Sequence, residues 1–244
     1  MTYNPQVILH RAGGFLAPEN TIEAMQIGVT LPVEGIEIDV SFTKDHIPVV
    51  YHDRSLKRTT GLHRPIRKMN YLDIRDLDNG SWFDPAYSHA KIPTLKQFLT
   101  TFKRRKLLYL EVKESDPKLL LIPKLISEQG MMDTTIFLSF HFQALLDIKE
   151  TYPEATIMFL LGAKWKRSFS YTVDPRMDWY GLSFQLAHKK PQLVTRLLEH
   201  GYKINIWSCN DMTIADQLIK LGITSITTDK PQEMLDHIKS SLPR

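Results

Sequence analysis

The chain of 244 residues carries a formal net charge of +4, is 43% hydrophobic and contains a single cysteine, Cys209. One cysteine excludes an intramolecular disulfide framework and fits a reducing compartment. No apolar run reaches the roughly 18 residues that a membrane span needs, and the first residues lack the basic and apolar regions of a signal peptide. We therefore expect a cytoplasmic protein without a transmembrane segment, long enough for one large domain.

Strand-like and helix-like segments alternate along the chain. The segments with the apolar or alternating pattern of strands are Val7–His10, Gly35–Thr43, Leu107–Lys113, Thr135–His141, Thr156–Leu161, Trp179–Phe184, Lys203–Cys209 and Ser225–Thr228. The segments with helical periodicity are Thr21–Thr30, Thr94–Lys103, Lys118–Gln129, Phe142–Glu150, Gln192–His200, Met212–Lys220 and Gln232–Lys239. This alternation indicates an α/β protein with a parallel sheet covered by helices, and eight strands in so short a chain favour a (β/α)8 TIM barrel. The link from Gly162 to Asp178 is the weakest unit of the pattern, because it has little helical period.

One segment of about forty residues, 53–93, interrupts this alternation after an extra strand predicted at Ile47–Tyr51. It is rich in Arg, Asp, Gly, Pro and Tyr and has little helical periodicity. Loops of this length are usually functional or carry small structure of their own. We interpret the segment as an insertion on the barrel rim, after the second strand, within a single domain that covers residues 1–244.

Two short basic clusters lie at Lys103–Lys106 and Lys164–Arg167. Such clusters are usually solvated helix ends and loops, and charge alone is weak evidence for a partner. We therefore expect no nucleic-acid partner.

Polar residues gather at the carboxyl ends of the predicted strands, where barrels of this kind place their functional groups. His10 and Arg11 end the first strand. Glu37 and Asp39 are two positions apart in the second strand, so both side chains point to one face. The third strand repeats this spacing with Glu111 and Lys113, which we expect to face the same interior. The remaining polar strand ends are His52 with Asp53, Trp207 with Asn210, and Asp229.

Three inward carboxylates, Glu37, Asp39 and Glu111, would repel one another in a confined site. Each pair at about 4 Å costs on the order of 4 kcal/mol at an effective dielectric constant near 20. Protonation, ion pairs with Arg11 and Lys113, or a bound cation would each relieve this repulsion. Oxygen ligands of this kind suit a hard cation such as Mg²⁺ or Ca²⁺. Strand geometry alone leaves a metal site and a structural ion-pair cluster open.

The order of the motifs resembles the glycerophosphodiester phosphodiesterase family. The similar segments are His10–Gly14, Ala17–Thr21, Glu37–Val40, Thr43–Asp45, Val49–Asp53, Leu56–Gly61, Gly80–Phe83, Ile92–Leu95, Glu111–Lys113, Ile206–Asn210 and Thr227–Pro231. They span nearly the whole chain, and such an ordered set is far more specific than a lone His-Arg pair. One departure is Ala12, where the family commonly has glycine; since Gly13 and Gly14 follow, we expect a small local adjustment and an intact site.

The resemblance implies a TIM barrel that cleaves glycerophosphodiesters, as small-molecule substrates, to glycerol 3-phosphate and an alcohol. It implies that a divalent cation, Mg²⁺ or Ca²⁺, is held by Glu37, Asp39 and Glu111. His10 and His52 would act as acid and base, Arg11 and Lys113 would grip the phosphate, and Trp207 would pack against the glycerol carbons. We expect His141 to be a helix-boundary residue, and Arg58 and Arg64 to be solvated.

Two alternatives remain beside this interpretation. The first is cleavage of lysophospholipids in the manner of a lysophospholipase D, which needs an apolar groove at the rim. Its candidate aromatic residues are Trp82, Phe83, Trp165 and Phe169. The second is a non-catalytic barrel that binds phosphodiesters. Against it, both histidines and all three carboxylates are present, although a binding protein would be free to lose some of them.

Overall fold

Eight parallel strands form a closed barrel in the computed structural model, which describes residues 4–113, 115–166 and 173–241. The strands are β1 (Gln6–Leu9), β2 (Gly35–Phe42), β4 (Leu107–Val112), β5 (Thr135–Ser139), β6 (Thr156–Leu161), β7 (Trp179–Ser183), β8 (Lys203–Trp207) and β9 (Ser225–Thr228). They follow one another in this order, and pairing of β1 with both β2 and β9 closes the ring. The predicted α/β barrel is therefore confirmed. The extra strand, β3 (Pro48–Val50), runs antiparallel to β2 outside the ring.

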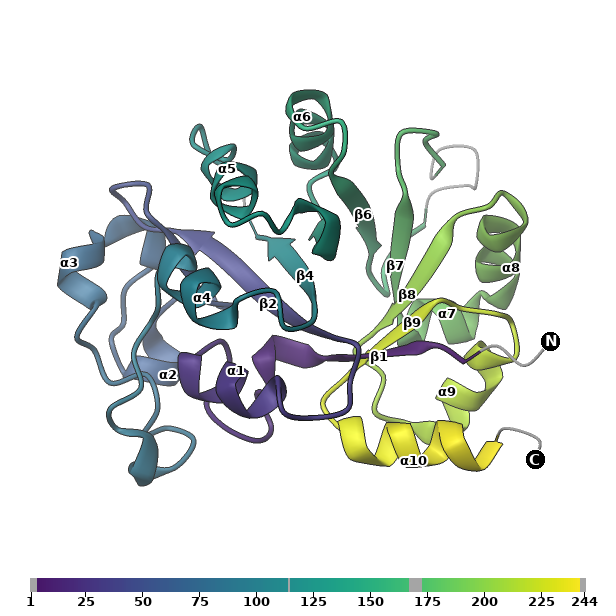
Figure 1. Cartoon of the computed structure of the whole chain (residues 1–244), viewed down its shortest axis with the longest axis horizontal. Helices are drawn as coiled ribbons and strands as arrows, with labels where there is room; N and C mark the ends of the chain where they lie inside the picture. Colours follow the sequence, from purple (N-terminus) through teal and green to yellow (C-terminus); the bar gives the residue numbers. More distant parts are fainter. Residues whose placement is uncertain (1–3, 114, 167–172, 242–244) are drawn as a thin grey trace.

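Helices ring the barrel (Figure 1). They are α1 (Ile22–Gly28), α4 (Leu95–Phe102), α5 (Leu121–Glu128), α6 (Phe142–Thr151), α8 (Pro191–Glu199), α9 (Met212–Ile219) and α10 (Pro231–Ser241). In α4 the buried residues Leu95, Phe98, Leu99 and Phe102 recur at helical spacing and form one apolar face. Thr94 begins this helix by accepting a hydrogen bond from the Gln97 backbone N–H. None of the described helices is both long and apolar enough to cross a membrane.

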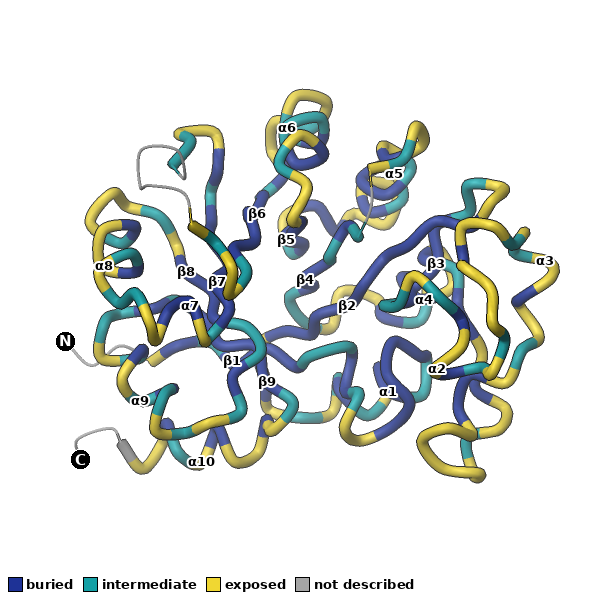
Figure 2. Tube along the Cα trace, turned by 180° about the vertical axis from the view of Figure 1, so that it is seen from behind, coloured by how far each residue is buried: buried dark blue, intermediate teal, exposed yellow. Residues whose placement is uncertain are grey.

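Each strand of the barrel buries both of its faces, so the strands form the dark centre of Figure 2. In β2, Ile36 and Ile38 face outward into the large core between barrel and helices. The alternate positions face the interior, whose floor includes Ile8, Tyr109 and Trp179. The period of two therefore leaves Glu37 and Asp39 inside the barrel, as the sequence predicts.

The segment 53–93 lies to one side of the barrel, where Figure 1 labels α2 and α3. Its short helices are α2 (Lys57–Thr60), η2 (Ile66–Lys68), α3 (Tyr71–Ile74) and η3 (Pro85–Tyr87). Leu56, Ile66 and Ile74 are buried in a small core of their own together with Val49 and Ile92. The predicted insertion after the second strand is confirmed, and it carries more helical turns than its sequence pattern suggested.

Outside the insertion, the sequence pattern missed one α-helix of the described residues. Helix α7 (Phe184–Lys189) follows β7 directly, where the sequence pattern continued the strand to Phe184. It is only six residues long, too short for an apolar period, and Ser183 begins it by accepting a hydrogen bond from the Leu186 backbone N–H. In the link from Gly162 to Asp178 the described residues contain no helix, and residues 167–172 lie outside the described part.

Candidate active site

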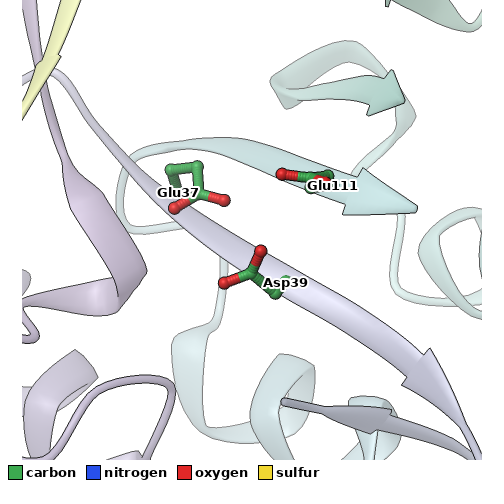
Figure 3. A group of neighbouring side chains, drawn as sticks. All are labelled: Glu37, Asp39 and Glu111. Carbon is green, nitrogen blue, oxygen red and sulfur yellow. The ribbon is translucent and has the colours of Figure 1, made fainter. Parts of the chain in front are cut away.

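Three carboxylates meet inside the barrel mouth. Glu37 and Asp39 project from β2 and Glu111 from the neighbouring β4, and the carboxylates lie close together (Figure 3). Asp39 and Glu111 are register partners, so parallel pairing places them side by side. Oxygens from the three groups all lie within 4.8 Å of one another. The predicted convergence of these side chains is confirmed.

The charges of this cluster are strongly perturbed. Burial, together with the charge of Asp39, raises the pKa of Glu37 to about 8. Burial and the charge of Asp39 also raise the pKa of Glu111. Burial acts on Asp39 in the same direction, but the charges of Lys113, His52 and Arg11 outweigh it and lower the pKa of Asp39. The cluster therefore holds a proton at neutral pH unless a further cation compensates its charge. A donor set of buried carboxylate oxygens fits a hard divalent cation.

Two basic side chains border the cluster. Lys113 Nζ lies 2.9 Å from Glu111 Oε1 and 3.3 Å from Asp39 Oδ1. The Arg11 backbone N–H donates to Glu37 Oε2 at 2.9 Å. Arg11 Nε is buried without a hydrogen-bond partner among the described residues, 3.8 Å from Asp39 Oδ2. Both basic groups therefore lie where an anion bound over the carboxylates would meet them.

His10 is held by a chain of polar side chains from the last two strands. Its Nδ1 lies 2.7 Å from Asp229 Oδ1, and Asn210 Nδ2 donates to Asp229 Oδ2 at 2.8 Å. Burial lowers the pKa of His10, but the hydrogen bond with Asp229 and the charge of Glu37 outweigh it, so the pKa is raised. With Nδ1 engaged in this way, the other ring nitrogen is left for proton transfer.

His52 is held in a similar way from the insertion. Its Nδ1 lies 2.6 Å from Asp53 Oδ1, and Arg58 Nε donates to Asp53 Oδ2 at 2.7 Å. Burial lowers the pKa of His52, and the charge of Asp39 only partly offsets this effect. The two histidines thus share one arrangement, a ring nitrogen bound to a carboxylate, although one carboxylate is 219 positions away and the other is the next residue.

Arg58 connects the residues around His52 with the residues around Arg11. Its Nη1 donates to Glu19 Oε2 at 3.0 Å, and Glu19 Oε1 accepts a further bond from Arg11 Nη1 at 3.0 Å. Its guanidinium also lies 5.2 Å from the centre of the Trp82 ring. The expectation that Arg58 is merely solvated is therefore wrong. Its two carboxylate partners, Glu19 and Asp53, lie close to it in the folded structure. The composition of the loop does not predict these pairs.

A cavity of about 1030 Å³ opens beside the cluster. It is lined by Ser41, His52, Asp53, Arg54, Ser55, Lys57, Arg58, Glu111, Lys113, Phe140 and His141. Trp207 lies next to this cavity, because its ring meets Phe140 edge to face at 5.4 Å between centroids. His141 directly precedes α6, as expected, but it also lines the cavity, and its Nε2 lies 3.1 Å from the Lys113 carbonyl oxygen. All eight predicted site residues thus belong to one end of the barrel.

Several supporting residues were given no role in the site by the sequence analysis, although it named some of them as polar strand ends. They are Glu19, Asn20, Asp53, Arg58, Asn210 and Asp229. Each lies in a motif segment or directly after a strand, so a signal was present, but sequence spacing gave no pairing. Asn20 Nδ2, for example, donates to Asp39 Oδ2 at 2.8 Å. The departure at Ala12 falls in the left-handed region, with φ 60°. That conformation favours glycine, and Gly13 follows at φ 115°.

Fold and site together define a TIM barrel with an acidic, metal-compatible cluster at its C-terminal mouth. The pattern of the glycerophosphoryl diester phosphodiesterase family matches residues 10–233, and the chain belongs to this family.

Relatives match over nearly the whole length. A glycerophosphodiester phosphodiesterase of Caldanaerobacter subterraneus subsp. tengcongensis is 30% identical, with 96% of this chain and 97% of the relative covered. An Oleispira antarctica phosphodiesterase, solved with the product sn-glycerol-3-phosphate, is 27% identical with a TM-score of 0.87 and 96% and 97% of the two chains covered. A glycerophosphodiester phosphodiesterase of Parabacteroides distasonis, at 24% identity and a TM-score of 0.83, covers 98% and 99% and shares the fold.

Proposed function

We propose that this protein hydrolyses glycerophosphodiesters to glycerol 3-phosphate and an alcohol. The observation that carries the proposal is the pair of carboxylate-held histidines, His10 and His52, on either side of a buried acidic cluster. Family membership and the product found in the Oleispira relative support the same substrate class. The arrangement offers what a phosphodiester cleavage needs, which is an acid, a base and compensation of phosphate charge.

Glu37, Asp39 and Glu111 would hold a divalent cation, Mg²⁺ or Ca²⁺. When bound, such a cation supplies Lewis-acid chemistry and neutralises negative charge on the phosphate oxygens. The protein's own cations add to this. The guanidinium of Arg11 matches two phosphate oxygens, and the ammonium of Lys113 acts as a point charge. These two groups bind and orient the scissile phosphate above the cluster.

The two histidines would then move the protons. As the glycerol 2-hydroxyl oxygen attacks phosphorus, one histidine takes its proton, while the other protonates the departing alkoxide. The product of this step is the free alcohol and a five-membered cyclic phosphate. Water then opens the ring with the proton roles reversed, which yields glycerol 3-phosphate. Acid and base groups of this kind typically contribute about 10²- to 10⁴-fold each.

Trp207 would pack against the glycerol carbons. It ends β8, and Gly181 of β7 leaves room for it, since a Cβ at position 181 would lie 3.3 Å from Trp207 Cδ1. The indole Nε1 is buried and has no hydrogen-bond partner in the described part of the chain. An amphipathic ring in this position suits a polyol, which offers carbons for packing and hydroxyls as acceptors.

Cleavage of lysophospholipids is less well supported. Trp82 and Phe83 pack on each other in the insertion, and Trp165 packs on Phe159. None of these rings lines the cavity, so they do not form one apolar groove there. Phe169 lies outside the described residues.

We also propose a cytoplasmic location, because the single Cys209 is a free, buried thiol that fits a reducing compartment.

The test is a protein stripped of metal with a chelator and assayed on glycerophosphocholine, glycerophosphoethanolamine and lysophosphatidylcholine. Mg²⁺, Ca²⁺ or Mn²⁺ is added back, and glycerol 3-phosphate and free alcohol are measured separately. We expect metal-restored release of glycerol 3-phosphate from the glycerophosphodiesters. A matched control is the variant Glu37→Gln, which keeps the side-chain shape and removes one ligand charge. Full activity in strong chelator, or no release with any metal, would refute the proposal.

A further inference from the structure

A second hollow continues the active-site cavity outward along the insertion. It measures about 500 Å³ and shares Arg54, Ser55 and His141 with the first cavity. Beyond these shared residues it is bordered by Arg67 and Lys68 of η2. The two hollows therefore form one groove that leads from the carboxylate cluster toward the edge of the molecule, on the side of β4 and β5.

Four basic side chains line this groove and are defined here as the basic rim. They are Arg54, Lys57, Arg67 and Lys68. Within residues 4–113, 115–166 and 173–241, no ion pair or side-chain hydrogen bond joins any of them to a carboxylate or a carbonyl group. Two other arginines of the insertion are paired, Arg58 with Glu19 and Asp53, and Arg75 with Asp76.

The described carboxylates that line the two hollows do not neutralise this charge. Asp53 is already bound to His52 and Arg58, and Glu111 is bound to Lys113. The described lining of the outer hollow contains no acidic residue. A hollow whose walls carry charges of one sign concentrates its field on the ligand inside.

We propose that the basic rim binds a second phosphate group, carried by the alcohol part of the substrate. This inference rests on the proposed function and specifies its substrate class as glycerophosphodiesters with a phosphorylated head group. Two guanidinium groups, on Arg54 and Arg67, offer the planar geometry that matches phosphate oxygens. A cationic head group such as choline is disfavoured, because among the described lining residues Phe140 is the one Phe, Tyr or Trp ring against several positive charges.

The test compares two substrates that differ only in one phosphate, glycerophosphoinositol and glycerophosphoinositol 4-phosphate. We expect kcat/KM to be on the order of tenfold higher for the phosphorylated substrate at low ionic strength, since two exposed charge pairs each contribute a few-fold. The preference should shrink as salt is raised to about 1 M, where the Debye length falls to about 3 Å. Equal kcat/KM values for both substrates at low salt would overturn the inference and leave the proposed function intact.

Variants of the basic rim test which residues produce the preference for the phosphorylated substrate. Arg54→Gln and Arg67→Gln should each reduce the ratio of the two kcat/KM values by a few-fold. The ratio is measured within each variant, so a general loss of activity cancels. The matched control is Arg75→Gln, which removes the same charge from the same insertion but lies outside both hollows. An equal fall of the ratio in the control would assign the preference to net charge and contradict a built site. Loss of activity on both substrates in the wild-type protein would instead count against the proposed function.

Discussion

At the scale of single residues, Lys113 has two possible roles that the structure brings into contact. Its ammonium neutralises Glu111 and Asp39 at 2.9 and 3.3 Å, and it also lines the cavity where a phosphate would lie. Burial lowers the pKa of Lys113, but the charges of Asp39 and Glu111 outweigh it and raise the pKa, so the group stays charged. A bound divalent cation would take over the neutralising role and leave the lysine to the substrate.

Lys113→Met separates these roles, because it keeps the apolar stem and removes the charge. With saturating metal we expect little change in thermal stability and a fall in kcat/KM of about 100-fold or more, since the transition-state charge loses a partner. Thermal unfolding and steady-state kinetics are measured on the same preparation. A variant that melts much earlier yet turns over normally when folded would return Lys113 to a purely structural role.

Asp229 controls the protonation of His10. Asp229→Asn keeps the shape of the partner but removes the charge that raises the pKa of His10 against the effect of burial. The pKa of His10 should therefore fall, and the limb of the pH profile of kcat/KM that belongs to His10 should move to lower pH. Asp53→Asn is the control, because it acts on His52 and should move the other limb. Two unchanged limbs in Asp229→Asn would separate Asp229 from the protonation of His10.

At the scale of elements, the insertion takes part in the site through Arg58. This residue of α2 binds Asp53, which holds His52, and Glu19, which holds Arg11. The burial of Ile66 and Ile74 fixes the insertion as a structured element, so Arg58 is presented from a defined position. The insertion thereby helps to position both His52, which we propose for proton transfer, and Arg11, which we propose for phosphate binding.

Arg58→Gln should lower kcat by about 10- to 100-fold, the usual range for groups that orient active-site side chains. Arg58→Lys should recover part of the activity, because it restores the charge without the fork geometry. Arg75→Gln, with its exposed pair to Asp76, serves as the control and should keep normal turnover. A normal kcat in Arg58→Gln would show that Asp53 holds His52, and Glu19 holds Arg11, without help from Arg58.

At the scale of the whole molecule, metal binding should be linked to stability. A cation at 100 times its dissociation constant stabilises the folded state by about 2.7 kcal/mol, and for a chain of this size that corresponds to a rise in Tm of roughly 5–10 °C. Thermal unfolding with and without Mg²⁺ or Ca²⁺ measures this shift. Glu37→Gln should lose most of it. A shift that is equal in the wild type and the variant would place the cation elsewhere.

The barrel and its insertion should also unfold together, since we propose that residues 1–244 form one domain. Val49 and Tyr51 of the β3 region belong to the small core of the insertion, while β3 pairs with β2 of the barrel. Calorimetry should therefore give a single transition whose calorimetric and van't Hoff enthalpies agree. Two resolved transitions would instead make the insertion a separate folding unit.

The sequence by itself determined the alternation of elements and the direction of the side chains. Apolar runs bounded by helical periods specify strands and helices, and a spacing of two specifies that Glu37 and Asp39 share a face. The length and composition of segment 53–93 indicate an insertion, and this inference does not depend on the rest of the fold. These features are local, because each depends on residues that are near neighbours in the chain.

Only the tertiary structure decided which polar groups pair. His10 and Asp229 are 219 positions apart and meet because the barrel closes between β1 and β9. Arg58 and Glu19 are 39 positions apart and meet because the insertion lies against one side of the active-site cavity. The periodicity of a sequence specifies the face on which a side chain lies but not the strand or loop opposite to it. Barrel closure and the placement of the insertion decide which strand or loop lies opposite each side chain.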